Sequence, residues 1–92
     1  MKNINNNIFV SRFPHLDIHG ENRASAEYII RDFVNDNFKL GNEYIVIIHG
    51  KGQGILKNIV HKILSEDKRV IEHKLDNHNL GSTIVHLKLD KE

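Results

Sequence analysis

Apolar residues in the first half of the chain follow a helical period. Between residues 22 and 38 they recur at steps of three and four, which places them on one side of a helix: Ala26, Ile29, Ile30, Phe33, Val34 and Phe38. Asn22 is a suitable N-cap, and Gly41 is a natural helix stop because glycine readily adopts positive φ. The pattern therefore predicts a helix that begins after Asn22 and runs to about Phe38.

A strand, a glycine-rich turn and a second helix follow. Tyr44-Ile45-Val46-Ile47-Ile48 is a continuous and mostly β-branched run, typical of an interior strand that is buried on both faces. Residues 50–54 hold three glycines and predict a turn. After the turn, apolar residues again fall on one helical side as far as about Ser65: Leu56, Ile59, Val60, Ile63 and Leu64.

Three further segments have the alternation of strands. The first is expected from His15 to His19, directly after Pro14, and the other two at Val70–Leu75 and Thr83–Leu89. In the segment Val70–Leu75, alternation predicts that Ile71, His73 and Leu75 share one face of the sheet and that Val70 lies on the other. The polar segment Asp76–Ser82 is expected to be a loop between the last two strands.

These elements predict an α/β domain with the order β-α-β-α-β-β. Strands that alternate with helices imply a mixed four-stranded sheet with parallel crossovers, which are nearly always right-handed. With 92 residues, the chain is expected to form one such domain at residues 14–90.

The asparagine-rich start of the chain predicts a flexible N-terminal arm at residues 1–13. The strand at residues 44–48 is apolar on both sides, so the sheet needs cover on both faces. Part of that cover could come from the arm, through Ile8, Phe9, Val10 and Phe13, or from a second copy of the chain. We therefore expect a monomer or a weak homo-oligomer.

Composition excludes several classes of function. The chain has no cysteine, which rules out disulfides, thiolate chemistry and cysteine zinc sites. It has neither the apolar run of about 18 residues that a membrane span needs nor the apolar start of a secretory signal. We therefore expect a cytoplasmic protein with no membrane partner. Net charge is only +1, although residues 51–74 carry six basic against three acidic residues.

The first candidate for chemistry is Leu16-Asp17-Ile18-His19-Gly20. On a strand, Asp17 and His19 would project from the same face, and a carboxylate beside an imidazole can orient the ring and tune its pKa. Ligands of parallel α/β sheets usually bind at the carboxyl ends of the strands, where this pair is expected. The pattern is short, however, and by itself it indicates a surface pair more often than a catalytic one.

The second candidate is His49-Gly50-Lys51-Gly52-Gln53-Gly54, between a buried strand and a helix. Its glycines would let the backbone approach a ligand closely, and the start of the next helix would favour an anion such as phosphate. The segment lacks the Gly-Lys-Ser/Thr ending of a Walker A loop and the third glycine of a dinucleotide fingerprint. The alternative is a tight turn that holds no ligand.

The remaining polar residues give weaker signals. Arg23, at the start of the first helix, is a candidate phosphate contact. The chain has seven histidines, which raises the possibility of a metal site, but no His-x₃-His pair lies within one predicted helix. Four of them are expected to face solvent or the edge of the core: His61, His73, His78 and His86.

Taken together, these segments resemble the small MutS-related (Smr) domain family. The resemblance rests on Leu-Asp-x-His-Gly, then Ile-Ile-His-Gly-Lys-Gly-x-Gly-x-Leu, then Gly-Ser-Thr-x-Val-x-Leu, in order from about Leu16 to Lys88. The family usually has extra glycines before its final strand, where this chain has Asn77-His78-Asn79-Leu80. This difference bears on the conformation of that loop and on any phosphate contact it makes.

The resemblance implies a two-layer sandwich with both helices on one face of the sheet. It also implies nucleic-acid binding and, in members that keep Asp and His in the first motif, an endonuclease that nicks DNA or cleaves RNA, in some cases on ribosomes. We expect a stand-alone member and infer no ATPase function. Asp17, His19 and Lys51 are then the candidate catalytic residues. The candidate phosphate-binding residues are His49, Gly50, Gly52, Gly54 and Arg23.

The expected mechanism depends on the substrate. For RNA, the 2′-hydroxyl can attack the phosphate and no metal is required, whereas DNA needs an activated water and favours Mg²⁺ near Asp17. The rival function is a non-catalytic module that binds RNA, DNA or the ribosome through the same glycine-rich loop.

Overall fold

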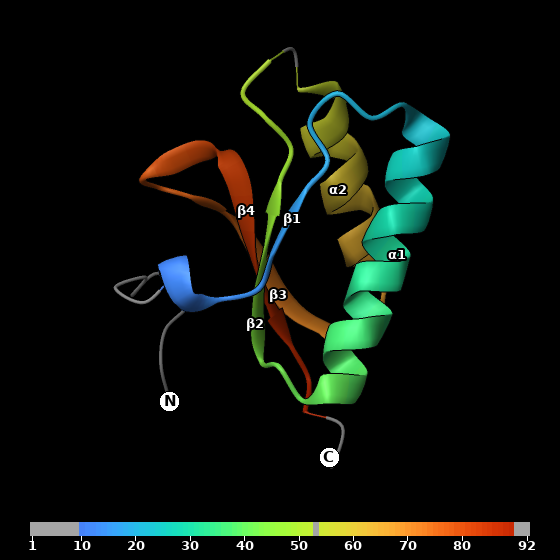
Figure 1. The fold of residues 1–92 in the computed structure, drawn as a ribbon, viewed down its shortest axis with the longest axis vertical. Helices are drawn as coiled ribbons and strands as arrows, with labels where there is room; N and C mark the ends of the chain where they lie inside the picture. Colours follow the sequence, from blue (N-terminus) through green and yellow to red (C-terminus); the bar gives the residue numbers. More distant parts are fainter. Residues whose placement is uncertain (1–9, 53, 90–92) are drawn as a thin grey trace.

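The fold follows the predicted order of strands and helices (Figure 1). The computed structural model describes residues 10–52 and 54–89. Its elements are a 3-10 turn η1 (Val10–Arg12), β1 (His15–Asp17), α1 (Arg23–Leu40), β2 (Tyr44–Ile48), α2 (Ile55–Ser65), β3 (Val70–Asp76) and β4 (Asn79–Leu87). Of the predicted domain, residues 53 and 90 lie outside the described residues.

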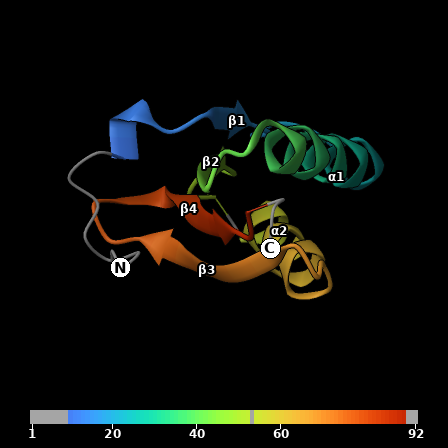
Figure 2. The ribbon, with the colours of Figure 1, turned by 90° about the horizontal axis from the view of Figure 1, so that it is seen from below.

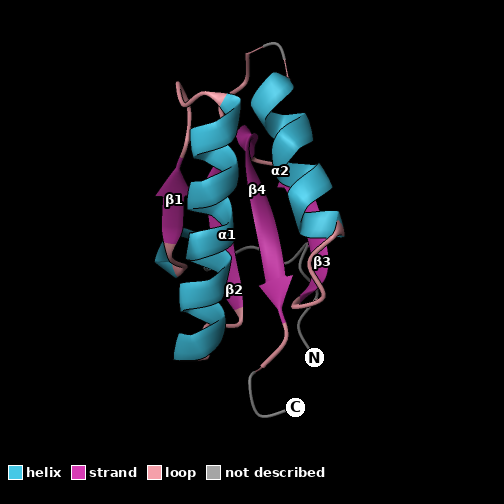
Figure 3. Ribbon diagram, turned by 90° about the vertical axis from the view of Figure 1, so that its right-hand side faces the viewer, coloured by secondary structure: helices cyan, strands magenta, loops and turns pink. Residues whose placement is uncertain are grey.

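The four strands form one mixed sheet in the order β1-β2-β4-β3. β1 and β2 are parallel, and β4 runs antiparallel to both of its neighbours, β2 and β3. The last strand of the sequence therefore lies inside the sheet, as Figure 2 shows from below. Both helices cover the same face of the sheet (Figure 3), which confirms the predicted two-layer architecture.

The main core lies between the helices and the sheet. Its fully buried members include Ile45, Ile47, Val85 and Leu87 from the strands and Ile18, directly after β1, and these pack against the apolar sides of both helices. The helices begin and end where the sequence predicts. The Asn22 side chain accepts a hydrogen bond from the Ser25 backbone N–H at 2.9 Å, and Gly41 ends α1 with φ of 79°.

The opposite face of the sheet has a smaller apolar cluster. Val46 and Ile84 are buried there, and Val10, Phe13, Tyr44 and Ile48 pack against them. The Phe13 and Tyr44 rings stack with centroids 5.2 Å apart. Val10 and Phe13 of the predicted arm thus cover part of this face, whereas Ile8 and Phe9 lie outside the described residues.

The last two strands differ most from the sequence prediction. β3 and β4 form a hairpin that pairs Asp76 with Asn79, so only Asn77 and His78 form the turn, and the predicted loop at residues 76–82 is wrong. Strand pairing prevails over the polar composition because local hydrogen bonds satisfy the polar groups. The Asp76 carboxylate accepts from the His78 N–H at 2.9 Å, and the Asn79 side chain accepts from the Gly81 N–H at 3.0 Å.

The predicted faces of β3 also need correction. The pairing of β3 with β4 shifts register between Val70 and Glu72, as a β-bulge does. Val70 consequently packs against the helix-side core, on the same side as His73, while Ile71 is 54% exposed. Among the described residues, none of the helices has the length and hydrophobicity needed to span a bilayer.

We expect Ile47→Ala to destabilise the fold much more than the matched substitution Ile71→Ala. The Ile47 side chain is completely buried in β2, so its truncation should lower the free energy of unfolding by about 2–5 kcal/mol. The same change at the exposed Ile71 should cost less than about 1 kcal/mol. Urea denaturation of both variants measures this difference, and equal losses would contradict the described packing.

Candidate functional site

The two predicted motifs meet at one edge of the sheet. β1 and β2 are parallel and in register from His15 opposite Val46 to Asp17 opposite Ile48, so both strands end at the same level. The Ile18 N–H donates to the Ile48 carbonyl at 2.8 Å and extends the pairing by one residue. As a result, a Cβ built on Gly50 would lie 3.5 Å from the His19 Cβ.

Asp17 and His19 form a hydrogen-bonded pair at this edge. The strand ends at Asp17 rather than at His19 as predicted, and His19 lies in the turn that follows. The carboxylate of Asp17 accepts from the His19 ring Nδ1 at 2.5 Å and from the His19 backbone N–H at 3.1 Å. This arrangement directs the second ring nitrogen, Nε2, away from Asp17.

The pair lies in water, with side-chain exposures of 69% for His19 and 50% for Asp17. The hydrogen bond to Asp17, with the carboxylate charge, raises the pKa of His19 above its ordinary value. The hydrogen bond from His19 lowers the pKa of Asp17 in turn. Asp17 is therefore ionised near neutral pH, and His19 is an imidazole that can both accept and give up a proton there.

The glycine loop, which we define as residues 49–52 and 54, lines a hollow beside this pair. Gly50 and Gly54 have φ of 89° and 84°, which other residues rarely adopt, and Gly54 is the N-cap of α2. The hollow has a volume of about 460 Å³. Its lining comes from the turn after β1, the glycine loop and the first turn of α2: His19, Gly20, His49, Gly50, Lys51, Gly52, Gly54, Ile55, Leu56 and Lys57.

Gly81 of β4 holds the glycine loop in place. Its carbonyl accepts two hydrogen bonds, from the N–H of His49 at 2.8 Å and from the N–H of Gly50 at 2.9 Å. A Cβ at position 81 would lie 3.3 Å from the carbonyl carbon of Gly50 and from Cγ of Lys51. The Gly50 N–H is thus used within the protein, so an anion on the loop would have to bind groups further along the chain.

His49 supports the loop from beneath. Its side chain is buried, Nδ1 lies 2.9 Å from the Gly50 carbonyl, and Nε2 lies 2.9 Å from the hydroxyl of Thr83. Both ring nitrogens are therefore engaged within the protein. Burial lowers the pKa of His49.

The Thr83 hydroxyl also contacts His61, which in turn contacts His73. His61 Nε2 lies 2.9 Å from the hydroxyl, and His61 Nδ1 lies 2.7 Å from Nδ1 of His73. His61 and His73, which were expected to face solvent or the core edge, thus join one network with His49. Burial, with the nearby His73, His49 and Lys57, lowers the pKa of His61 to about 4.

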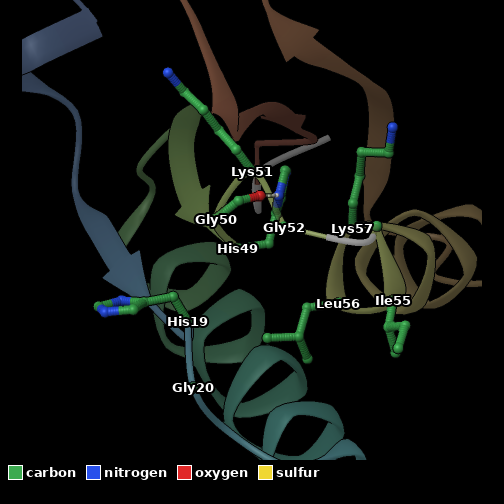
Figure 4. Close-up of a pocket in the computed structure, with 10 residues that line it drawn as sticks. His19, Gly20, His49, Gly50, Lys51, Gly52, Ile55, Leu56 and Lys57 are labelled. Atoms are coloured by element: carbon green, nitrogen blue, oxygen red, sulfur yellow. Dashed lines mark hydrogen bonds between the residues drawn. The ribbon is translucent and has the colours of Figure 1, made fainter.

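Two lysines lie at the hollow, of which sequence reasoning identified one. In the view of Figure 4, Lys51 and His19 extend to one side of the loop, and Lys57 extends from α2 on the other. A second hollow of about 310 Å³, lined also by Leu75 and Leu80, shares both lysines. Lys57 could have been found from its place in the first turn of the helix that follows the loop.

The candidate phosphate contact Arg23 lies outside both hollows; it is the first residue of α1. Groups of three or more His, Cys, Asp or Glu side chains that could hold a metal ion do not occur within residues 10–52 and 54–89. A divalent ion at Asp17 would therefore depend on substrate phosphates and water for most of its ligands.

Comparisons with known proteins place the sequence and the fold among proteins of one family. The sequence profile of the Smr domain matches residues 16–88. The protein named Endonuclease MutS2 from Halothermothrix orenii is 33% identical over 70 residues, 76% of this chain and 9% of that protein. The protein of the same name from Thermotoga neapolitana is 37% identical over 76 residues, 82% of this chain and 10% of that protein. The chain thus spans about a tenth of the length of these relatives.

Two solved structures share the fold. The crystal structure of the Smr domain of Thermus thermophilus MutS2 has a TM-score of 0.78 and 27% identity, covering 82% of this chain and 98% of that one. YdaL, a stand-alone small MutS-related protein from Escherichia coli, has a TM-score of 0.70 and 22% identity, covering 80% of this chain and 63% of that one.

We expect Asp17→Asn to lower the pKa of His19 toward the ordinary value of 6.5. Asparagine keeps a similar shape but has no charge to favour the protonated ring. NMR titration of the His19 ring protons in both proteins measures the change. An unchanged pKa would show that the pair does not form in solution.

We also expect Gly81→Ala to lower stability and to displace the glycine loop, because the added methyl group would press on the Gly50 backbone. Gly52→Ala is the matched control, since a Cβ there meets nothing within 4 Å. Thermal unfolding and the amide NMR shifts of His49 and Gly50 report the two effects. If the amide shifts of His49 and Gly50 were the same in both variants, Gly81 would not hold the loop.

Proposed function

We propose that this chain, which belongs to the Smr domain family, binds nucleic-acid phosphates at the glycine loop and cleaves the strand there. One observation carries the proposal: the Asp17–His19 pair lies directly beside the loop, with the His19 Cβ 3.5 Å from the position that a Cβ on Gly50 would occupy. The name of its MutS2 relatives, Endonuclease, supports nuclease chemistry for the family segment that this chain shares.

Binding of the nucleic-acid strand would depend on two features, the positive charge of the lysines and the N–H groups at the start of α2. Lys51 is exposed and Lys57 is half-buried, and both line the two hollows at the loop. The first N–H groups of α2 follow Gly54, which has no side chain to cap them, so they favour an anion. A strand that crosses the loop could contact both lysines with successive phosphates.

His19 would move the proton in the reaction. With its Nδ1–H donated to Asp17, Nε2 carries the lone pair and can accept a proton from the 2′-hydroxyl of RNA. The 2′-oxygen then bonds to phosphorus, the bond from phosphorus to the 5′-oxygen breaks, and that oxygen takes a proton from Lys51 or water. The products would be a 2′,3′-cyclic phosphate and a 5′-hydroxyl. Lys51 would also stabilise charge on the phosphoryl oxygens.

RNA is the substrate that these residues suit best. The internal 2′-hydroxyl needs only a positioned base, which His19 supplies, whereas DNA cleavage needs an activated water. If DNA were the substrate, Asp17 would hold Mg²⁺, and the ion would supply the activated water. Asp17 already accepts two hydrogen bonds from His19, so such an ion would compete with the pair described here.

We expect cleavage of end-labelled single-stranded RNA by the wild-type chain, and a loss of at least about a hundredfold in both Asp17→Asn and His19→Ala. His78→Ala, at an exposed histidine in the β3–β4 turn, is the matched control and should cleave normally. Each protein is assayed with magnesium and with EDTA, beside supercoiled plasmid. Mass spectrometry of the product ends identifies the cyclic phosphate.

The same assay separates the nuclease from a module that only binds. Wild-type protein that binds RNA but leaves it and the plasmid intact would overturn the catalytic part of the proposal. Binding should still weaken in Lys51→Ala, with the slope of log affinity against log salt reduced by about 0.7 for single strands. Lys68→Ala, in the turn after α2 and away from both hollows, is the control for a general loss of charge.

A further inference from the structure

The side chains beneath the glycine loop form a continuous network of hydrogen bonds. We call it the imidazole network. Among the described residues it consists of six contacts, each of which leads to the next. They link the Gly50 carbonyl to His49, His49 to Thr83, Thr83 to His61, His61 to His73, His73 to Ser65, and Ser65 to the His61 carbonyl. The network begins at the glycine loop and ends at an exposed serine, Ser65, on α2.

The neutral network has too few hydrogens for its contacts. Each neutral imidazole has one N–H, and each hydroxyl has one O–H, so three rings and two hydroxyls supply five hydrogens. Both ends of the network are carbonyl oxygens, which only accept, so all six contacts need a hydrogen from within it. In the neutral state one contact must therefore lack its hydrogen. One added proton completes all six.

The added proton has no fixed position. It can reside on His49, His61 or His73, and in each case the remaining hydrogens can be arranged so that every contact has one donor and one acceptor. Moving the charge from one ring to the next only requires hydrogens to shift along existing bonds. The 2.7 Å separation of the His61 and His73 nitrogens is short for such a contact and suits a charge-assisted bond.

The surroundings keep the network neutral when nothing is bound. Burial is the largest of the effects that lower the pKa of each of the three rings. Lys57, from α2, also lowers the pKa of His49 and His61. Two interactions act in the opposite direction: the hydrogen bond to the Gly50 carbonyl raises the pKa of His49, and the charge of Glu72, from β3, raises that of His73. The rings also repel a second charge, because His49 and His73 each lower the pKa of His61. A second added proton is therefore disfavoured.

We propose that the imidazole network takes up one proton when a phosphodiester binds the glycine loop. The anion would offset the charge of Lys57, and the positive charge would move toward His49, directly beneath the loop. The bound phosphate would then face a buried cation below as well as the lysines beside it. This inference rests on the proposed nucleic-acid binding and adds a proton-linked part to the same site.

Isothermal titration calorimetry with single-stranded oligothymidylate tests the proposal, in EDTA and in two buffers of different ionisation enthalpy. Neither thymine nor the phosphodiester titrates near neutral pH, so any buffer-dependent heat reports protons taken up by the protein. All proteins carry His19→Ala, which removes the exposed imidazole of the cleavage site. Measurements on both sides of pH 6.5, the ordinary pKa of histidine, should show uptake, with affinity rising by at most about tenfold per pH unit as pH falls.

Two substitutions outside the glycine loop make the number of hydrogens equal to the number of contacts. Ser65→Ala removes one hydrogen and two contacts at the exposed end, and Thr83→Val separates His49 from His61. Each leaves a neutral network in which every remaining contact has its hydrogen, so proton uptake should fall by more than half. Thr83→Ser keeps the hydroxyl and should keep the uptake, as should Ser11→Ala, an exposed serine outside the network.

The outcomes separate the two proposals. Oligothymidylate that binds with no buffer-dependent heat, or with uptake unchanged in Ser65→Ala and Thr83→Val, would overturn the inference and leave the proposed function intact. No binding of oligothymidylate or RNA at any pH would overturn both. Since Thr83 is buried, Ser65→Ala on the surface of α2 carries the test if Thr83→Val does not fold.

Discussion

The carbonyl of Gly81 is the contact on which the candidate site depends. It accepts the N–H groups of both His49 and Gly50, and so fixes the first two residues of the glycine loop to the central strand β4. A side chain there would press on the loop, because a Cβ would lie 3.3 Å from the carbonyl carbon of Gly50. With the loop fixed in this way, the parallel register of β1 and β2 places His19 beside Gly50. The position of the site is thus set by backbone pairing within the sheet.

Sequence reasoning predicted the elements whose signals are local. Both helices follow a clear apolar period, and Asn22 and Gly41 mark the ends of the first through their own capping chemistry. It failed where pairing between strands overrides composition. Residues 79–82 look like a loop because all but Leu80 are polar or glycine, yet β4 includes them, since Asp76 and Asn79 satisfy the polar groups of the hairpin. The bulge after Val70 changes the side of the sheet that Val70 faces, and no period of two reveals it.

The candidate site also has one part that local sequence signals predict and one part that depends on contacts between distant segments. Asp17 and His19 are two residues apart, and the glycine loop is one short segment, so each could be identified from its own spacing. Thr83, His61 and His73 come from β4, α2 and β3, and only the folded chain brings them together. Taken one at a time, each of these histidines looks like an ordinary surface or core-edge residue. Their importance lies in the hydrogen bonds that they share, which sequence spacing does not encode.

The two groups of histidines lie in different environments, and this difference determines what each can do. His19 is largely exposed, so water screens its interaction with Asp17, and the ring can exchange protons freely with solvent or substrate. The imidazole network is screened much less, because His49 is buried and His61 and His73 are half-buried. A charge there interacts more strongly with an anion on the loop. Under the proposed function, His19 therefore suits proton transfer at the scissile phosphate. The network suits a change in the affinity for that phosphate, so binding and cleavage would respond to pH through separate groups.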